Sequence, residues 1–263
     1  SRAMILRRFA QALKEQNWTS ITIEFALLVL GVFLGIQAAN WNEARQTGEK
    51  SGVFSERLKD DLRREAQRYL FLQEYSRDVQ AATEASANAL TGKLPLSNEA
   101  LLINAYRATQ YRAAPSFRTT YDELIATGNL GLIEDRTMLN LALAVYRLNS
   151  LELLERDSIA SRYRVLFREG IPHDVQRTLA SRCGDRFIEI DGKIDRDHVI
   201  DYPCTSELPA DDIDAAANAL RADPKILRQL SKRVVDLDSH LANLAANMRS
   251  TFERKAEIFG EAP

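Results

Sequence analysis

The sequence predicts a mainly α-helical protein: one N-terminal transmembrane helix, then an extramembrane antiparallel helical bundle with a small disulfide-closed loop or hairpin. Residues 18–41 form a largely apolar run, in which Glu24 is the one ionisable residue between Ile21 and Ala39. A run of about 20 such residues is long enough for a helix to cross a bilayer. The rest of the chain is rich in helix-favouring Ala, Leu, Arg and Glu, and the 263 residues include only 11 Gly and 7 Pro.

The flanks of the apolar run indicate how it would lie in a membrane. Residues 1–17 are predicted to be an amphipathic lead on the cytoplasmic side of the membrane. The reason is that Lys and Arg are more numerous before the apolar run than just after it. Trp18 and Trp41 are candidate interfacial anchors, since 23 helical steps place them roughly 34 Å apart. A cleaved signal peptide is the alternative. The long lead and the absence of a good small-x-small cleavage site favour an uncleaved anchor.

One face of the predicted span is small and polar. Gly31 and Gly35 have the spacing that lets a second helix approach closely. The whole candidate interface consists of Glu24, Leu28, Gly31, Gly35, Ala38 and Ala39. We expect this face to associate with another helix. Two alternatives are that Glu24 only reaches the headgroups, or that it titrates or carries ions.

Residues 42–52 are predicted to be a juxtamembrane linker with a break or bend near Gly48 and Gly52. Residues 53–263 are predicted to form a periplasmic helical domain. Its first helix covers about 53–90, and Gly92 with Pro95 ends it.

Capping residues and breaks place the remaining helices. Ser97 is a candidate N-cap for a helix to about Tyr111, and Asp135 for one long helix to about Arg168. Asp223 before Pro224 predicts the start of the last helix. Shorter helices are expected at 119–126, 173–181 and 211–221.

The last predicted helix has the clearest apolar periodicity in the chain. Its apolar residues follow steps of three and four, which is typical of a coiled coil or a long bundle helix. They are Leu227, Leu230, Val234, Leu237, Leu241, Leu244 and Met248. Such a seam needs a partner along its full length, and the other long helices of an antiparallel bundle could provide one.

The two cysteines, Cys183 and Cys204, flank a polar segment with turn residues. A disulfide between them would require an oxidising compartment, which in a bacterium is the periplasm. Within 183–204, residues 187–190 and 193–195 resemble a β-hairpin around Asp191 and Gly192. An irregular loop, and two free thiols, are the alternatives.

Chemical signatures are weak. A net charge of -2 gives no basic field for nucleic acid. His173, His198 and His240 lack metal-ligand spacing, and no nucleophile motif or phosphate loop is present, so we expect no enzyme, no metal and no cofactor. The acidic residues around His198 could bind a cation, but a solvated loop is the favoured interpretation; they are Asp191, Asp195, Asp197 and Asp201.

An arginine and tyrosine cluster around Pro115 is the candidate ligand or partner rim. Its members are Arg107, Arg112, Arg118, Tyr106, Tyr111 and Tyr121. Guanidinium groups and tyrosines are common at anion sites and at interfaces. The alternative is that the tyrosines pack inside and the arginines face water or acidic groups.

Two segments resemble an uncharacterised family of bacterial single-pass membrane proteins. The span ends with Gln37, then Asn40-Trp41-Asn42-Glu43, similar to that family's Q-x-x-N-W-N-E signature. Residues 127–133, TGNLGLI, are similar to its S-G-x-L-x-L-I segment, with Thr127 where serine is usual. The resemblance implies a membrane-anchored helical domain and supplies no activity or catalytic residue.

The leading hypothesis is a periplasmic interaction or scaffold protein held in the inner membrane by one span. It would self-associate or join a larger membrane complex, so the expected partners are the membrane, a second copy or other membrane subunits, and not nucleic acid. One alternative is an ion-coupled energy-transducing subunit that uses Glu24. Another is a periplasmic sensor of a small ligand.

Overall fold

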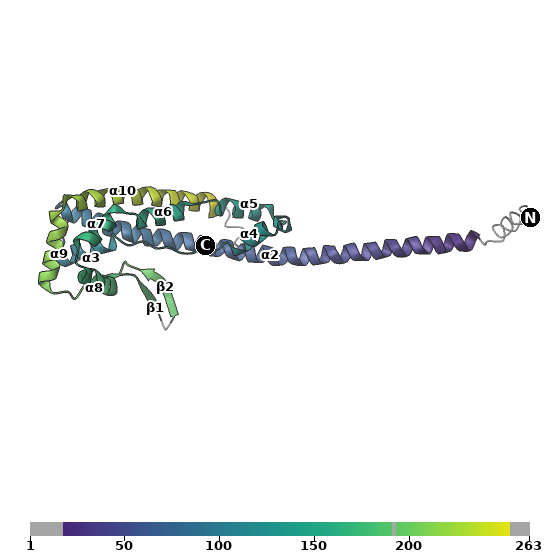
Figure 1. Ribbon diagram of the computed structural model, residues 1–263, viewed down its shortest axis with the longest axis horizontal. Coiled ribbons are helices and arrows are strands. Elements are labelled where there is room, and N and C mark those ends of the chain that lie inside the picture. The colour runs from purple at the N-terminus through teal and green to yellow at the C-terminus, as the bar shows by residue number, and fades with distance from the viewer. Residues whose placement is uncertain (1–17, 191–192, 253–263) are drawn as a thin grey trace, which may run out of the picture. The chain divides into compact units, whose positions relative to one another are not determined.

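The computed structural model describes the backbone of residues 18–190 and 193–252, and the side chains of 21–187 and 199–252 (Figure 1). The predicted lead at 1–17, the side chain of Trp18 and the expected hairpin turn at Asp191 and Gly192 lie outside these ranges. The chain divides into two compact units. The first is Ser1–Ser55 with Gly131–Glu134, and the second is Glu56–Leu130 with Asp135–Pro263.

In the first unit, helix α2 (Trp18–Leu90) carries the apolar run. Every residue from 21 to 50 is exposed, and the helix is long and apolar enough to cross a membrane. Its apolar side chains therefore do not belong to a protein core, and the segment is a possible membrane span.

The predicted bend near residues 42–52 is absent, because α2 continues through them without interruption. Glycine permits a bend but does not impose one. Ser51 is buried, and its hydroxyl donates a hydrogen bond to the carbonyl of Leu132, 2.6 Å away. This bond attaches Gly131–Glu134 to the helix within the first unit.

In the second unit, the remainder of α2 buries one stripe of side chains at steps of three and four. The buried apolar residues of this stripe include Leu58, Leu62, Ala66, Tyr69, Leu72 and Val79. The helix ends at Leu90, and Gly92 follows it with a φ of 74°, a left-handed conformation that suits glycine.

Three predicted N-caps are confirmed. Ser97 accepts from the backbone of Ala100 before α3 (Asn98–Arg107), and Asp135 accepts from Thr137 before α5 (Arg136–Val145). Asp223 caps α10 (Pro224–Asn247), which continues as one π-helical turn, η2 (Met248–Phe252). The other helical elements are α4 (Thr119–Ala126), η1 (Leu130–Leu132), α8 (His173–Cys183) and α9 (Ala210–Ala222).

The prediction of one helix from Asp135 to Arg168 is wrong. The structure has three helices there: α5, α6 (Ser150–Ile159) and α7 (Arg162–Gly170). A straight helix would place Leu148 and Ile159 on the buried face, yet Ile159 is 47% exposed. The breaks turn Leu151 and Leu154 inward instead, so tertiary packing overrides a continuous helical propensity.

Most of the apolar seam of α10 is buried within its own chain, and its members Leu227 and Val234 are half-buried. Leu230, Leu237, Leu241, Leu244 and Met248 are all less than 10% exposed. Helix α10 packs along α6 and α7 (Figure 1). The predicted helical bundle is confirmed, and the seam supplies its internal contacts.

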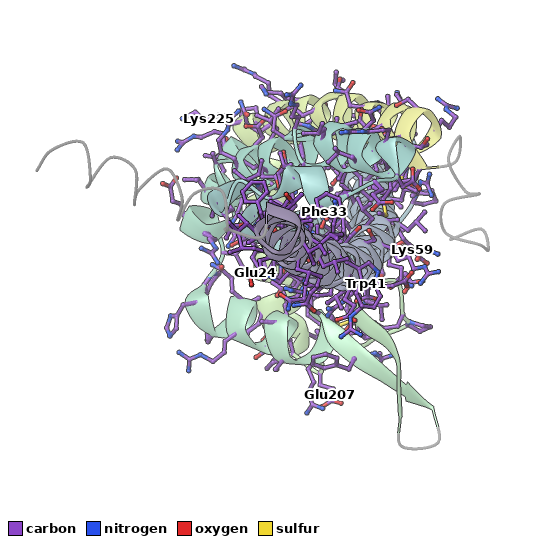
Figure 2. The ribbon with its side chains drawn as sticks, turned by 90° about the vertical axis from the view of Figure 1, so that its right-hand side faces the viewer. Glu24, Phe33, Trp41, Lys59, Glu207 and Lys225 are labelled. Atoms are coloured by element: carbon purple, nitrogen blue, oxygen red, sulfur yellow. A yellow bond between two sulfur atoms is a disulfide. The ribbon has the colours of Figure 1, made fainter. Side chains whose placement is uncertain are left out.

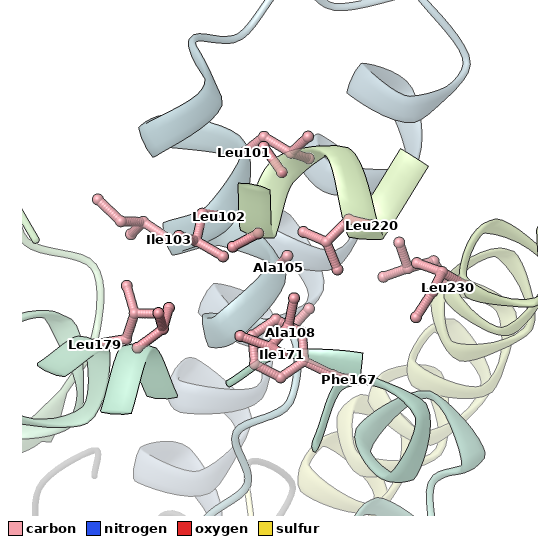
Figure 3. Packing of buried hydrophobic residues seen from close by; sticks show 14 of the residues in the cluster. Leu101, Leu102, Ile103, Ala105, Ala108, Phe167, Ile171, Leu179, Leu220 and Leu230 are labelled. Atoms are coloured by element: carbon pink, nitrogen blue, oxygen red, sulfur yellow. The ribbon is translucent and has the colours of Figure 1, made fainter. Parts of the chain in front are cut away.

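The main core of the second unit surrounds α3. Leu101 and Leu102 of this helix and Ala108, its C-cap, are at most 1% exposed. Figure 3 shows side chains from α7, α8, α9 and α10 converging on them, among them Phe167 and Leu220. Helix α3 is therefore the central element around which the chain closes.

The hairpin and the disulfide are both present. Strands β1 (Arg186–Ile190) and β2 (Lys193–Val199) pair in antiparallel orientation. The bond between Cys183 and Cys204 joins the end of α8 to the segment after β2, with their Cα atoms 5.6 Å apart. The loop-only and free-thiol alternatives are thus excluded.

Candidate functional site

The predicted transmembrane interface lies on an uncovered helix surface. A Cβ atom added at Gly31 or Gly35 would meet nothing within 4 Å, and Leu28 is 64% exposed. Glu24 and Phe33 are nine residues apart, which places them on opposite sides of the helix (Figure 2). In the single chain, no part of the described structure covers the small-residue face.

Of the two predicted anchors, only Trp41 can be assessed. Its side chain is 72% exposed. An exposed tryptophan next to an apolar helical run has the amphipathic character found at membrane interfaces.

The predicted arginine and tyrosine rim does not form one site. Arg107 holds the disulfide region instead. Its Nη2 donates to the carbonyl of Tyr202 at 2.8 Å and lies 3.3 Å from the Sγ of Cys204, and its Nε donates to the carbonyl of Cys183. Burial lowers the pKa of Arg107, and the Tyr202 interactions partly oppose that shift. This arginine is structural.

The other rim residues also have separate partners. Arg118 forms a two-oxygen contact with Asp122 and lies 5.7 Å from the ring centroid of Tyr121. The ring of Tyr111 lies under the guanidinium of Arg164, 4.7 Å from its centroid. The Nε of Arg112 is buried without a hydrogen-bond partner among the described residues. The interpretation that the tyrosines pack and the arginines face water or acidic groups fits Tyr111 and Arg118, whereas Arg107 binds backbone carbonyls.

A charged clamp that the sequence analysis missed fixes the connection between α3 and α4. Arg68 and Glu65 form a 2.6 Å ion pair inside the protein. Arg68 also donates to the carbonyl of Ala114, and Glu65 accepts from the backbone of Phe117 at 2.8 Å. One turn earlier, Asp61 accepts from the backbone of Thr120. The available signal was that Glu65 and Arg68 adjoin buried positions of the apolar stripe.

The carboxyl end of α3 is capped by side chains from distant helices. Arg233 of α10 donates to the carbonyls of Ala108 and Gln110 at 2.7 and 2.9 Å. Tyr163 of α7 donates to the carbonyl of Ala105. Burial lowers the pKa of Arg233 to about 10 and raises that of Tyr163. Cations at a helix carboxyl end are favourable, so Arg233 stabilises the end of α3, which lies at Arg107 and not near Tyr111 as predicted.

A cavity of about 490 Å³ lies between the α6–α7 junction and α10. Its wall carries both charges, including Asp157, Asp236, Lys232 and Arg233. His240 lies 3.3 Å from Asp157. The neighbouring Ser239 hydroxyl donates to the carbonyl of Val235 and not to the histidine, so these groups do not form a nucleophile-activating chain.

Metal chemistry has no support among the residues with described side chains, which contain no cluster of three or more His, Cys, Asp or Glu groups arranged to hold an ion. Most of the acidic group around His198 lies outside the described side chains, so the predicted cation loop stays untested.

Comparison with protein-family models, with curated proteins and with solved structures finds no match. The resemblance carried by residues 37–43 and 127–133 therefore stays a prediction from the sequence.

Proposed function

We propose that this protein is a membrane-anchored interaction or scaffold protein, with α2 crossing the inner membrane once and the helical bundle in the periplasm. In this proposal the span associates with another copy or with a subunit of a larger membrane complex. The observation that carries it is the exposed apolar part of α2, which no part of the described chain covers.

Two further features support this proposal. Most of the apolar seam of α10 packs inside the bundle, whereas the apolar part of α2 is uncovered within the described chain. The disulfide fits a domain outside the cytoplasm, where such bonds persist.

The first experiment tests anchoring and orientation. The full chain is expressed in a Gram-negative host as the Cys183→Ser/Cys204→Ser variant. A single cysteine replaces Glu43 in one version and Glu84 in another. Each cysteine is then labelled with a membrane-impermeant maleimide. We expect extraction only by detergent and labelling of both sites from the periplasmic side. Extraction by carbonate alone, or labelling only after the inner membrane is opened, would contradict the proposal.

The second experiment tests association through the small-residue face. Residues 18–41 are fused to a genetic reporter of transmembrane-helix dimerisation. Gly31→Ile and Gly35→Ile should lower the signal, because a larger side chain separates the helices. Phe33→Ile is the matched control, since it changes the opposite face (Figure 2). If neither glycine variant lowers the reporter signal and the full chain gives no crosslinked neighbour in cells, the scaffold proposal fails.

A further inference from the structure

A second cavity of the bundle, of about 230 Å³, lies between the end of α3, α7 and the first half of α8. Polar and basic groups dominate its wall. The residues relevant to binding are Tyr106, Gln110, Arg164, Arg168, His173 and Arg177.

Among the side chains that the structure describes, no carboxylate lines this cavity. Among the described residues, Arg164, Arg168 and Arg177 form no ion pair. This distinguishes it from the larger cavity, whose wall combines Asp157 and Asp236 with cations. Positive charge therefore converges on one concave surface without an internal counterion.

The acidic groups near the cavity have other positions or partners. Glu169 lies 4.0 Å from Arg162, and Asp185 accepts a hydrogen bond from Tyr75. Asp174 lies in the first turn of α8, outside the cavity wall, and offsets part of the positive field there.

The inner arginine is positioned by the fold. Arg164 donates through Nη1 to the carbonyl of Thr109, 3.1 Å away, and its guanidinium stacks over Tyr111. Burial lowers the pKa of Arg164, and the nearby charge of Arg168 lowers it further. Two close cations, one of them partly buried, raise the free energy of the empty site and are stabilised by an anion.

The outer arginines are available for a ligand. Arg168 near the end of α7 and Arg177 in the middle of α8 are exposed. Guanidinium groups match the oxygens of phosphate through paired N–H donors. The cavity is smaller than the roughly 300–1,000 Å³ typical of sites for drug-sized ligands, so a small group fits it best.

We propose that the cavity formed by Arg164, Arg168 and Arg177 binds a phosphate group. Arg168 and Arg177 contact its oxygens, and Arg164 supplies charge from below. The phosphate could be free in solution or belong to a lipid headgroup. This inference is independent of whether α2 associates with a partner.

Isothermal titration calorimetry on the full chain in a non-ionic detergent tests the proposal at constant ionic strength. The probes are inorganic phosphate and glycerophosphoglycerol, the deacylated headgroup of phosphatidylglycerol. Arg168→Gln and Arg177→Gln are each expected to weaken binding roughly tenfold, because a charge-assisted hydrogen bond is lost. Binding of inorganic phosphate would indicate a free ligand, and binding of the headgroup alone would indicate a lipid source.

Arg162→Gln is the matched control, since Arg162 lies on α7 but outside this cavity. It should leave affinity unchanged. Thermal unfolding of each variant checks folding, which should be retained because the two outer arginines are exposed and unpaired within the described structure. The proposal is overturned if neither probe binds, or if both arginine variants bind as tightly as the original chain.

Discussion

Glu65 and Arg68 lie on the same face of α2, three residues apart, and are paired inside the protein, 4% and 5% exposed respectively in their side chains. Both also bind the backbone of the connection after α3, at Phe117 and Ala114. The pair therefore joins α2 to an irregular segment that has few backbone hydrogen bonds of its own. Its charges are structural, because their hydrogen bonds go to the protein backbone.

Glu65→Gln should destabilise the second unit by about 3 kcal/mol, at the lower end of the cost of breaking a buried ion pair. The buried Arg68 would lose its main partner, and Glu152, 3.6 Å away, would compensate in part. Urea unfolding of the full chain in detergent, followed by near-ultraviolet circular dichroism, measures the change. Glu84→Gln, an exposed position on the same helix, should change stability by less than about 0.5 kcal/mol. Equal stability of both variants would contradict the clamp.

Reduction of the Cys183–Cys204 bond should lower the free energy of unfolding by about 3 kcal/mol, because the bond closes a loop of 21 residues. The urea midpoint with and without reductant measures this loss. The double variant Cys183→Ser/Cys204→Ser should have the lower midpoint already and should not respond to reductant. If the urea midpoint of the original chain is the same with and without reductant, the bond adds no stability.

Gly184→Ala should destabilise the protein by about 1–3 kcal/mol, the usual cost of overpacking. A Cβ atom at this position would lie 2.3 Å from the carbonyl oxygen of Ala180, and the backbone next to the disulfide would have to move. Thermal unfolding compares it with Gly170→Ala, where a Cβ meets nothing within 4 Å. The prediction is wrong if the two variants have the same melting temperature.

Stability should fall as the pH rises above about 10. Burial, followed by the charge of Asp185, raises the pKa of Tyr106 to about 12. A group whose pKa is raised by folding contributes stability that is complete below its unfolded pKa and is lost as the pH passes its folded pKa. Burial shifts the pKa of Tyr75, Tyr146 and Tyr163 in the same direction.

Arg233 opposes this trend, because its lowered pKa lets the folded protein release that proton earlier. Burial also lowers the pKa of Arg107 and Arg164, but the several tyrosines with a raised pKa should outweigh these three arginines. Urea midpoints across the alkaline range test the sign, and Tyr106→Phe should make the fall shallower. A midpoint that rises with pH in this range would contradict the assignment.

Local signals predicted much of the fold. Ser97, Asp135 and Asp223 are N-caps because their short polar side chains satisfy nearby backbone N–H groups, and this depends on neighbouring residues alone. The hairpin and the bond from Cys183 to Cys204 were each one of two interpretations of this segment, and the structure has both.

What the sequence did not reveal depends on contacts between distant residues. The breaks on both sides of α6 contain no proline or glycine, and α6 packs against the distant helix α10. The clamp joins Glu65 to Phe117, 52 residues later in the chain. The basic cavity likewise joins the end of α3 to α7 and α8. Helical periodicity carries no information on such contacts between distant residues. The arginine and tyrosine rim was a local cluster whose side chains have separate partners, near in the sequence for Arg118 and distant for Arg107.

The cap that Arg233 forms at the end of α3 has a consequence for folding during synthesis. Arg233 follows Ala108 by 125 positions, so at about 5–20 residues per second the ribosome adds it roughly 6 to 25 seconds later. Throughout that interval the carbonyl groups of Ala108 and Gln110 lack their arginine partner, and the centre of the bundle cannot close. A nascent chain stopped before α10 would thus expose an open core to proteases. The protein becomes resistant to them only once the last helix has been synthesised.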